Sequence, residues 1–143
     1  ISAEPSVERI ILRPHPRCRL DLRDLLRIEK VQMQRPQQAA LSFFEDVNVV
    51  LVPNSGVAIE SLHCGKPTFY VPGMDQIKAD YYGFVEAKIV PVLEEFDMEA
   101  LKRFSSFFDD NWIERYRVYD ETVGDSSNLA KSEISKRFRI FLE

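Results

Sequence analysis

The sequence predicts an α/β fold in which a parallel sheet of about five strands is flanked by helices and followed by a helical C-terminal tail. Three observations predict it. Short apolar runs alternate with segments of helical periodicity as far as residue 93. Residues 49–52 are Val and Leu throughout, which is typical of a strand buried on both faces of a parallel sheet. Beyond residue 93 the apolar residues recur only at helical spacing. Because strands that alternate with helices are joined by right-handed crossovers, we expect the strands to be parallel.

Five strands are expected, most of them bounded by proline, glycine or polar residues. They cover Arg9–Arg13, Val31–Gln34, Asn48–Val52, Thr68–Val71 and Ile89–Leu93. If the sheet closes without a further strand, the spatial order is 2-1-3-4-5, as in a flavodoxin sheet.

Helices are expected between these strands, over Leu20–Lys30, Gln37–Asp46, residues 56–64 and, as a short element, residues 80–87. Pro36 suits the first turn of the second helix. Gly65 suits the position just after the third helix, and Pro67 prevents its continuation.

The C-terminal tail is expected to hold three helices. Asp97 can cap the first and Asn111 the second. The third runs from about Ser127 to Leu142, and its apolar face is expected to pack on the sheet or on a partner domain. That face contains Leu129, Ile134, Phe138 and Phe141.

Composition indicates one domain over residues 1–143, with an α/β core at 1–93 and helices at 94–143. The formal net charge of −4 argues against a general nucleic-acid surface, and no apolar run is long enough to span a bilayer. We expect a cytoplasmic protein, with the inner face of a membrane as the alternative. Cys18 and Cys64 lack metal-type spacing and are expected to be reduced thiols.

The turn after the third expected strand has the features of a phosphate site. Asn54, Ser55 and Gly56 follow a buried strand and open a helix. Backbone N–H groups and a small hydroxyl at a helix N-terminus suit an anion. Glu60 lies about one turn inside that helix, where its carboxylate could reach a ribose or sugar hydroxyl.

The loop after the fourth expected strand carries Asp75 and Gln76. Ligands of open α/β sheets bind at the carboxyl ends of the strands, so this loop and the Asn54–Gly56 turn are expected to face one crevice.

Three motifs in this order resemble the donor-binding domain of nucleotide-sugar glycosyltransferases built from two Rossmann-like domains, the GT-B fold. They are NSGVAIESLHCGKP, the upstream element RIILRPHPR at Arg9–Arg17, and the downstream Pro72-x-x-Asp75-Gln76. The non-hydrolysing UDP-N-acetylglucosamine 2-epimerases are similar, and the His-Pro pair and Ser turn resemble those of bacterial sialyltransferases and polysialyltransferases. The resemblance covers Arg9 to Val92.

The resemblance implies a nucleotide-sugar substrate, UDP- or CMP-linked, in the synthesis of a capsule or other surface glycan, with no cofactor and no metal. The nucleotide phosphates would be held by Arg13, His15, Asn54, Ser55 and Gly56, and the ribose or sugar by Glu60, Asp75 and Gln76. Only eight residues precede Arg9, too few for the first strand of such a domain. A larger two-domain enzyme is therefore expected, whose missing partner domain binds the glycan acceptor and supplies the catalytic base, so that this chain alone binds without catalysing.

Each of these residues also has a structural interpretation. His15 could cap the sheet edge, Arg13 could form a salt bridge, and Ser55-Gly56 could be a tight helix cap. Glu60 could pair with Lys66 or Lys78.

Asp75 and Gln76 could be ordinary loop residues, and His63 is expected to be structural. The segment Asp80-Tyr81-Tyr82-Gly83 is expected to pack in the core.

Motifs for a nucleophilic elbow, a zinc protease or a nucleotide-binding P-loop are missing from the sequence, as is Gly-x-Gly-x-x-Gly. A function of another class, a non-catalytic α/β scaffold or regulatory module, remains open, as does a fragment of a sugar-nucleotide epimerase. Nucleotide binding would distinguish the scaffold from the enzyme.

Overall fold

The computed structural model describes residues 1–15, 18–19, 21–34, 39–76, 79–119 and 126–142. The chain divides into two compact units, Ile1–Asp46 and Val47–Glu143. Each unit is described by itself below.

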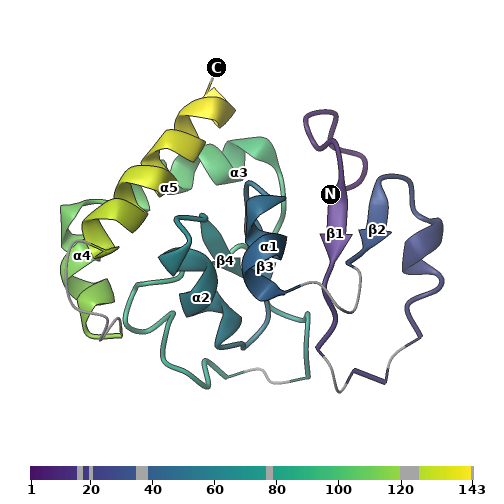
Figure 1. The fold of residues 1–143 in the computed structure, drawn as a ribbon, viewed down its shortest axis with the longest axis horizontal. Helices are drawn as coiled ribbons and strands as arrows, with labels where there is room; N and C mark the ends of the chain where they lie inside the picture. The colour runs from purple at the N-terminus through teal and green to yellow at the C-terminus, as the bar shows by residue number, and fades with distance from the viewer. Residues whose placement is uncertain (16–17, 20, 35–38, 77–78, 120–125, 143) are drawn as a thin grey trace. The chain divides into compact units, whose positions relative to one another are not determined.

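The first unit is built on a parallel pair of strands, β1 (Ile10–Leu12) and β2 (Val31–Met33), which lie side by side in Figure 1. Ile10 is in register with Val31, and Leu12 with Met33. The helix α1 (Ala40–Glu45) follows β2; the residues expected to begin it, 37 and 38, lie outside the described part.

The expected helix over Leu20–Lys30 is wrong for the described residues 21–30, which contain only a single 3-10 turn, η1 (Leu25–Arg27). The Asp21 carboxylate accepts the backbone N–H of Arg23 at 3.0 Å and its guanidinium at 2.6–2.9 Å. This local bonding competes with a helical backbone. Leu25 and Leu26, which were expected to form an apolar helix face, are 42% and 41% exposed.

The second unit contains a β-α-β crossover. Strands β3 (Val50–Val52) and β4 (Thr68–Tyr70) pair in parallel, and α2 (Val57–His63) connects them. After β4, Tyr70 and Val92 form a parallel bridge. The expected fifth strand is thus reduced to one bridge within the described residues.

The α/β class and the parallel direction of the strands are confirmed. Among the described residues the strands form two two-stranded sheets, β1-β2 and β3-β4, in place of one sheet of about five strands.

Helix α2 ends just before Gly65, as the sequence predicts, and its end forms a Schellman motif. Gly65 has a φ of +66°. Its N–H donates to the Leu62 carbonyl at 2.9 Å, and the Lys66 N–H donates to the Ser61 carbonyl at 3.0 Å. This pair of bonds satisfies carbonyls at the helix end and turns the chain into β4.

The C-terminal helices are α3 (Met98–Arg103), the 3-10 turn η2 (Phe104–Phe107), α4 (Asp110–Arg117) and α5 (Ser126–Leu142). Asp97 caps α3 as expected, accepting from the Ala100 N–H at 2.5 Å. The N-terminal cap of α4 is Asp109, whose carboxylate accepts the Trp112 backbone N–H at 2.8 Å. The prediction that Asn111 caps this helix is therefore wrong. Asn111 lies one position inside α4, past the residue whose side chain can reach the free N–H groups.

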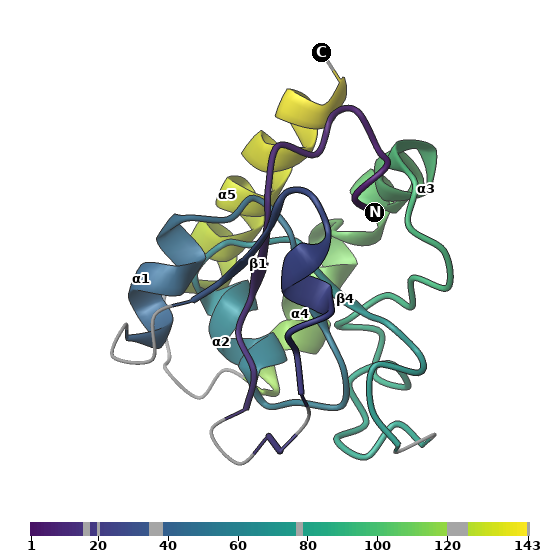
Figure 2. The same ribbon diagram turned by 90° about the vertical axis from the view of Figure 1, so that its right-hand side faces the viewer.

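The core of this unit centres on Trp112 and Tyr116 of α4, whose stacked rings lie 4.8 Å apart. The indole N–H donates to the Ile89 carbonyl at 3.0 Å. Helix α5 packs against α2, α3 and α4 (Figures 1 and 2). It does so through the face of Ala130, Ile134 and Phe138, all at most 3% exposed.

The prediction that Leu129 belongs to this face is wrong, because its side chain is 63% exposed. Leu129 precedes Ala130 by one position and therefore points away from the face that contacts the other helices. The Phe141 side chain lies outside the described part. Within the described ranges no helix has both the length and the apolar character needed to cross a membrane.

Candidate functional site

The turn between β3 and α2 has open space above its glycine. The Ser55 hydroxyl accepts the Val57 N–H at 3.3 Å, so it caps the first turn of α2. Gly56 has a φ of −60°, which any residue can adopt, and a Cβ built on it meets no atom within 4 Å. No partner for the Gly56 N–H is found among the described residues. The turn therefore offers one backbone N–H, at the positive end of a short helix, to an approaching group.

The loop after β4 meets this turn, as the sequence predicts. The Asp75 carboxylate accepts the Asn54 N–H at 3.0 Å. The Asn54 side chain donates to the Tyr70 hydroxyl at 3.3 Å, and its carbonyl accepts the Tyr81 N–H at 3.1 Å. Asn54 thus ties the end of β3 to the end of β4 and to the loop beyond it.

These bonds limit what Asn54 and Asp75 offer to a ligand. The backbone N–H and both ends of the Asn54 amide have partners within the protein, and one Asp75 oxygen is engaged in the same network. A carboxylate beside the Asn54 N–H also disfavours a phosphate at that N–H. The phosphate-binding capacity of the turn therefore rests on Ser55 and Gly56.

The predicted sugar ligands Glu60 and Gln76 are both exposed. Glu60 lies in the first turn of α2, and the structure shows no ion pair of Glu60 within the described ranges. Lys66, one partner considered for Glu60, is buried and donates to the Val47 carbonyl at 2.9 Å. The other, Lys78, lies outside the described residues.

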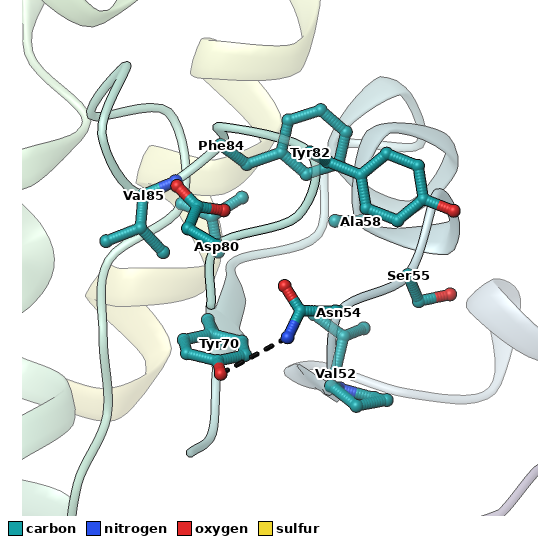
Figure 3. Close-up of a pocket in the computed structure, with 11 residues that line it drawn as sticks. Val52, Asn54, Ser55, Ala58, Tyr70, Asp80, Tyr82, Phe84 and Val85 are labelled. Atoms are coloured by element: carbon teal, nitrogen blue, oxygen red, sulfur yellow. Dashed lines mark hydrogen bonds between the residues drawn. The ribbon is translucent and has the colours of Figure 1, made fainter. Parts of the chain in front are cut away.

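A shallow hollow lies beside the turn and is drawn in Figure 3. Its cavity volume is only about 10 Å³, which is room for about one water molecule, and the rest of the hollow is open to solvent. In Figure 3 the rings of Tyr82 and Phe84 lie on one side and Tyr70 and Val52 on the other. The full lining is Val52, Pro53, Asn54, Ser55, Ala58, Tyr70, Asp80, Tyr82, Phe84, Val85 and Val90.

The segment from residue 80 to 88 forms turns in place of the expected short helix. The physical reason is Asp80, whose Oδ2 accepts the N–H groups of Val85 and Glu86, both at 2.8 Å, and so bends the chain. The expected core packing of Tyr81 and Tyr82 is also wrong, because they are 73% and 45% exposed.

These aromatic residues are the part of the candidate site that the sequence interpretation missed. Tyr82 stacks on Phe84 with ring centroids 5.2 Å apart and planes 15° apart. Tyr81 packs edge-on against Tyr82 at 5.1 Å. The signal was the density of aromatic residues in Tyr81-Tyr82-Gly83-Phe84 directly after a polar loop, a position where a core element is rare.

Arg13 and His15, the remaining predicted phosphate ligands, follow β1 in the first unit. Both are exposed. The Arg13 guanidinium lies over the Phe43 ring, 5.8 Å from its centroid. Their convergence with the turn after β3 stays a prediction.

Within the described residues no three His, Cys, Asp or Glu side chains lie together in a way that could hold a metal ion. Comparisons with models of protein families, with curated proteins and with solved structures found no match to this chain.

Proposed function

We propose that this chain is the donor-binding domain of a glycosyltransferase and that it binds a nucleotide sugar at the ends of β3 and β4. The observation that carries the proposal is the junction of the two loops through Asn54, beside the open Gly56 N–H. Both loops follow the carboxyl ends of paired parallel strands, where α/β proteins bind ligands. The sequence resemblance over Arg9 to Val92 supports the same assignment.

In this proposal a phosphate of the donor accepts the Gly56 N–H and bonds with the Ser55 hydroxyl at the start of α2. Partial positive charge at a helix N-terminus stabilises an anion by about 0.3–1 kcal/mol when the site is exposed. Arg13 and His15 would add charged donors if the two pairs of strands belong to one Rossmann-like sheet. Glu60 would accept from ribose hydroxyls.

The acceptor and the general base come from a partner domain in this proposal, so the chain by itself binds the donor and leaves it intact. No sequence motif of this chain supplies a nucleophile or a metal-activated water. Preorganised amides and cations can stabilise a departing diphosphate.

Isothermal calorimetry with UDP, CMP and CDP tests the proposal. We expect one of them to bind in the micromolar-to-millimolar range. Gly56→Ala should weaken that binding, because the new methyl group fills the space above the free N–H while the backbone conformation is kept. Leu129→Ala, an exposed position on α5, is the control and should bind as the wild type does.

A non-catalytic scaffold is the second candidate function. It is favoured by the exposure of the adjacent Tyr81 (73%) and Tyr82 (45%), since exposed tyrosines are enriched at protein interfaces. The same calorimetry separates the two candidates, because a scaffold would bind none of the three nucleotides.

A further inference from the structure

We infer that the nucleobase of the donor stacks on the ring of Tyr81. The inference rests on the proposed function and deepens it, because the residues assigned above bind phosphate, ribose or sugar and leave the base without a binding residue. Three observations carry it: the open face of the Tyr81 ring, the bonds that fix its position, and its closeness to the turn at Ser55 and Gly56.

The ring of Tyr81 has an open aromatic face. Tyr81 is the most exposed aromatic residue in the described part of the chain, at 73%. Its ring contacts Tyr82 edge to face, with centroids 5.1 Å apart and planes at 85°. Such a contact covers at most one face of one of the two rings. At least one face of Tyr81 is therefore open to a flat partner.

The bonds around Tyr81 hold its ring in place before any ligand arrives. Its backbone N–H donates to the Asn54 side chain at 3.1 Å. The neighbouring Asp80 carboxylate accepts two backbone N–H groups of the same loop, both at 2.8 Å. The Tyr82 ring, on which Tyr81 packs, is itself stacked on Phe84. A ring held in this way loses little conformational freedom when a base stacks on it.

Tyr81 lies close to the proposed phosphate site. Asn54, which binds the Tyr81 N–H, directly precedes Ser55, and the Cα atoms of Asn54 and Gly56 are at most about 7.6 Å apart. Tyr82, the ring neighbour of Tyr81, lines the same small hollow as Ser55 (Figure 3). A phosphate at Gly56 and a base on Tyr81 are thus separated by a distance that one nucleoside diphosphate can span.

The small size of the hollow favours this arrangement. Its cavity volume of about 10 Å³ has room for about one water molecule, so neither ring system of a nucleotide sugar enters it. The donor then lies across the two loops at the carboxyl ends of β3 and β4, where the open face of Tyr81 is available. A base presents the flat π face that stacks on such a ring, and this stacking accepts any base.

Calorimetry on the full 143-residue chain tests the inference, with UDP, CMP and CDP as nucleotides and inorganic pyrophosphate as the base-free probe. Tyr81→Ala should weaken the binding of each nucleotide that the wild type binds by about five- to tenfold, the lower part of the range for base–aromatic stacking, since one ring takes part. Pyrophosphate binding should not change. Because Tyr81 is exposed, its replacement leaves the core intact.

Matched variants separate stacking from a general apolar contact. Tyr81→Phe keeps the ring and should keep the nucleotide affinity, whereas Tyr81→Leu keeps an apolar side chain and should lose it as Tyr81→Ala does. Met74→Ala, a change at a residue of the same loop that is 52% exposed, is the control and should bind as the wild type does.

Proton NMR of UDP gives a direct signature of stacking. The H5 and H6 signals of uracil should move upfield on binding to the wild type and to Tyr81→Phe, because a proton over the face of an aromatic ring is shielded. The same signals should not move upfield with Tyr81→Ala.

Unchanged nucleotide affinity in Tyr81→Ala would overturn this inference and leave the proposed function standing. Equal weakening of pyrophosphate and of the nucleotides would also overturn it, because the substitution would then act on the loop and not on the base. A loss confined to UDP-glucose, with UDP unchanged, would place the sugar on Tyr81 in place of the base. Binding of none of the three nucleotides would overturn both the inference and the proposed function.

Discussion

Replacing Gly65 with alanine tests how α5 is docked on the end of α2. Gly65 has a φ of +66°, and a Cβ built on it lies 2.4 Å from the Glu133 Cβ of α5. The neighbouring Arg137 side chain donates to the Gly65 carbonyl at 3.2 Å and to the Asn48 side chain at 2.9 Å. The new methyl group therefore requires α5 or the α2–β4 turn to move.

The expected loss has two parts. A left-handed conformation costs a residue with a Cβ about 1–2 kcal/mol. Overpacking against backbone-fixed atoms costs about 1–3 kcal/mol. Together they predict that Gly65→Ala lowers the free energy of unfolding by roughly 2–5 kcal/mol.

Urea unfolding followed by circular dichroism measures the loss, and two other glycines serve as matched controls. Gly73 has a φ of +86° with no atom within 4 Å of a built Cβ, so Gly73→Ala should carry only the backbone cost. Gly56→Ala should carry neither, because its φ is −60° and the space is open. If Gly65→Ala costs no more than Gly73→Ala, α5 does not pack on Gly65 as described.

Three further predictions concern single contacts. Asp109→Ala should lower the melting temperature and Asn111→Ala should not, because Asp109 is the cap of α4. The hydrogen bond from the Trp112 backbone N–H holds the pKa of the Asp109 carboxyl below its ordinary value. The stabilisation from this carboxylate is therefore complete above about pH 3.9. This stabilisation is lost as the pH falls through the folded-state pKa of Asp109, which is the lower of the two. In a melting series at acidic pH, the difference in melting temperature between wild type and Asp109→Asn should therefore shrink. Trp112→Phe should lower the free energy of unfolding by about 1–3 kcal/mol, because the buried Ile89 carbonyl loses its donor; an unchanged urea midpoint would contradict this bond. His15→Ala should weaken nucleotide binding by about 0.5–1.5 kcal/mol, because one hydrogen-bond donor to the phosphates is lost, and equal affinities in calorimetry would remove His15 from the site.

Most of the regular structure could be predicted from the sequence because its signals are local. The Val-Leu run at β3, the glycine after α2 and the aspartate before α3 each act through the nearest few residues. The parallel pairing of β3 and β4 follows from the helix between them. The meeting of Asn54 with the loop after β4 could be predicted for the same reason.

The errors arose where an aspartate side chain bonds to backbone N–H groups of its own loop, and where packing selects which face of a helix is buried. Asp80 bends residues 80–88 through bonds to two N–H groups five and six positions ahead, which overrides a helical pattern. Asp21 acts in a similar way on the segment before β2. The exposure of Leu129 depends on which face of α5 contacts α2, α3 and α4. Apolar spacing alone does not determine whether Leu129 or its neighbour Ala130 lies on that face.

Titration of the chain with UDP, followed through its backbone amide NMR signals, tests the central claim most directly. We predict saturable shifts of the amides from Ser55 to Ala58 and of the loop at Asp80–Phe84, with signals from α5 unchanged. Since the Gly56 N–H has no partner among the described residues, its amide should shift most. A spectrum without saturable shifts, or with shifts confined to residues outside these two loops, would contradict a donor site at the ends of β3 and β4.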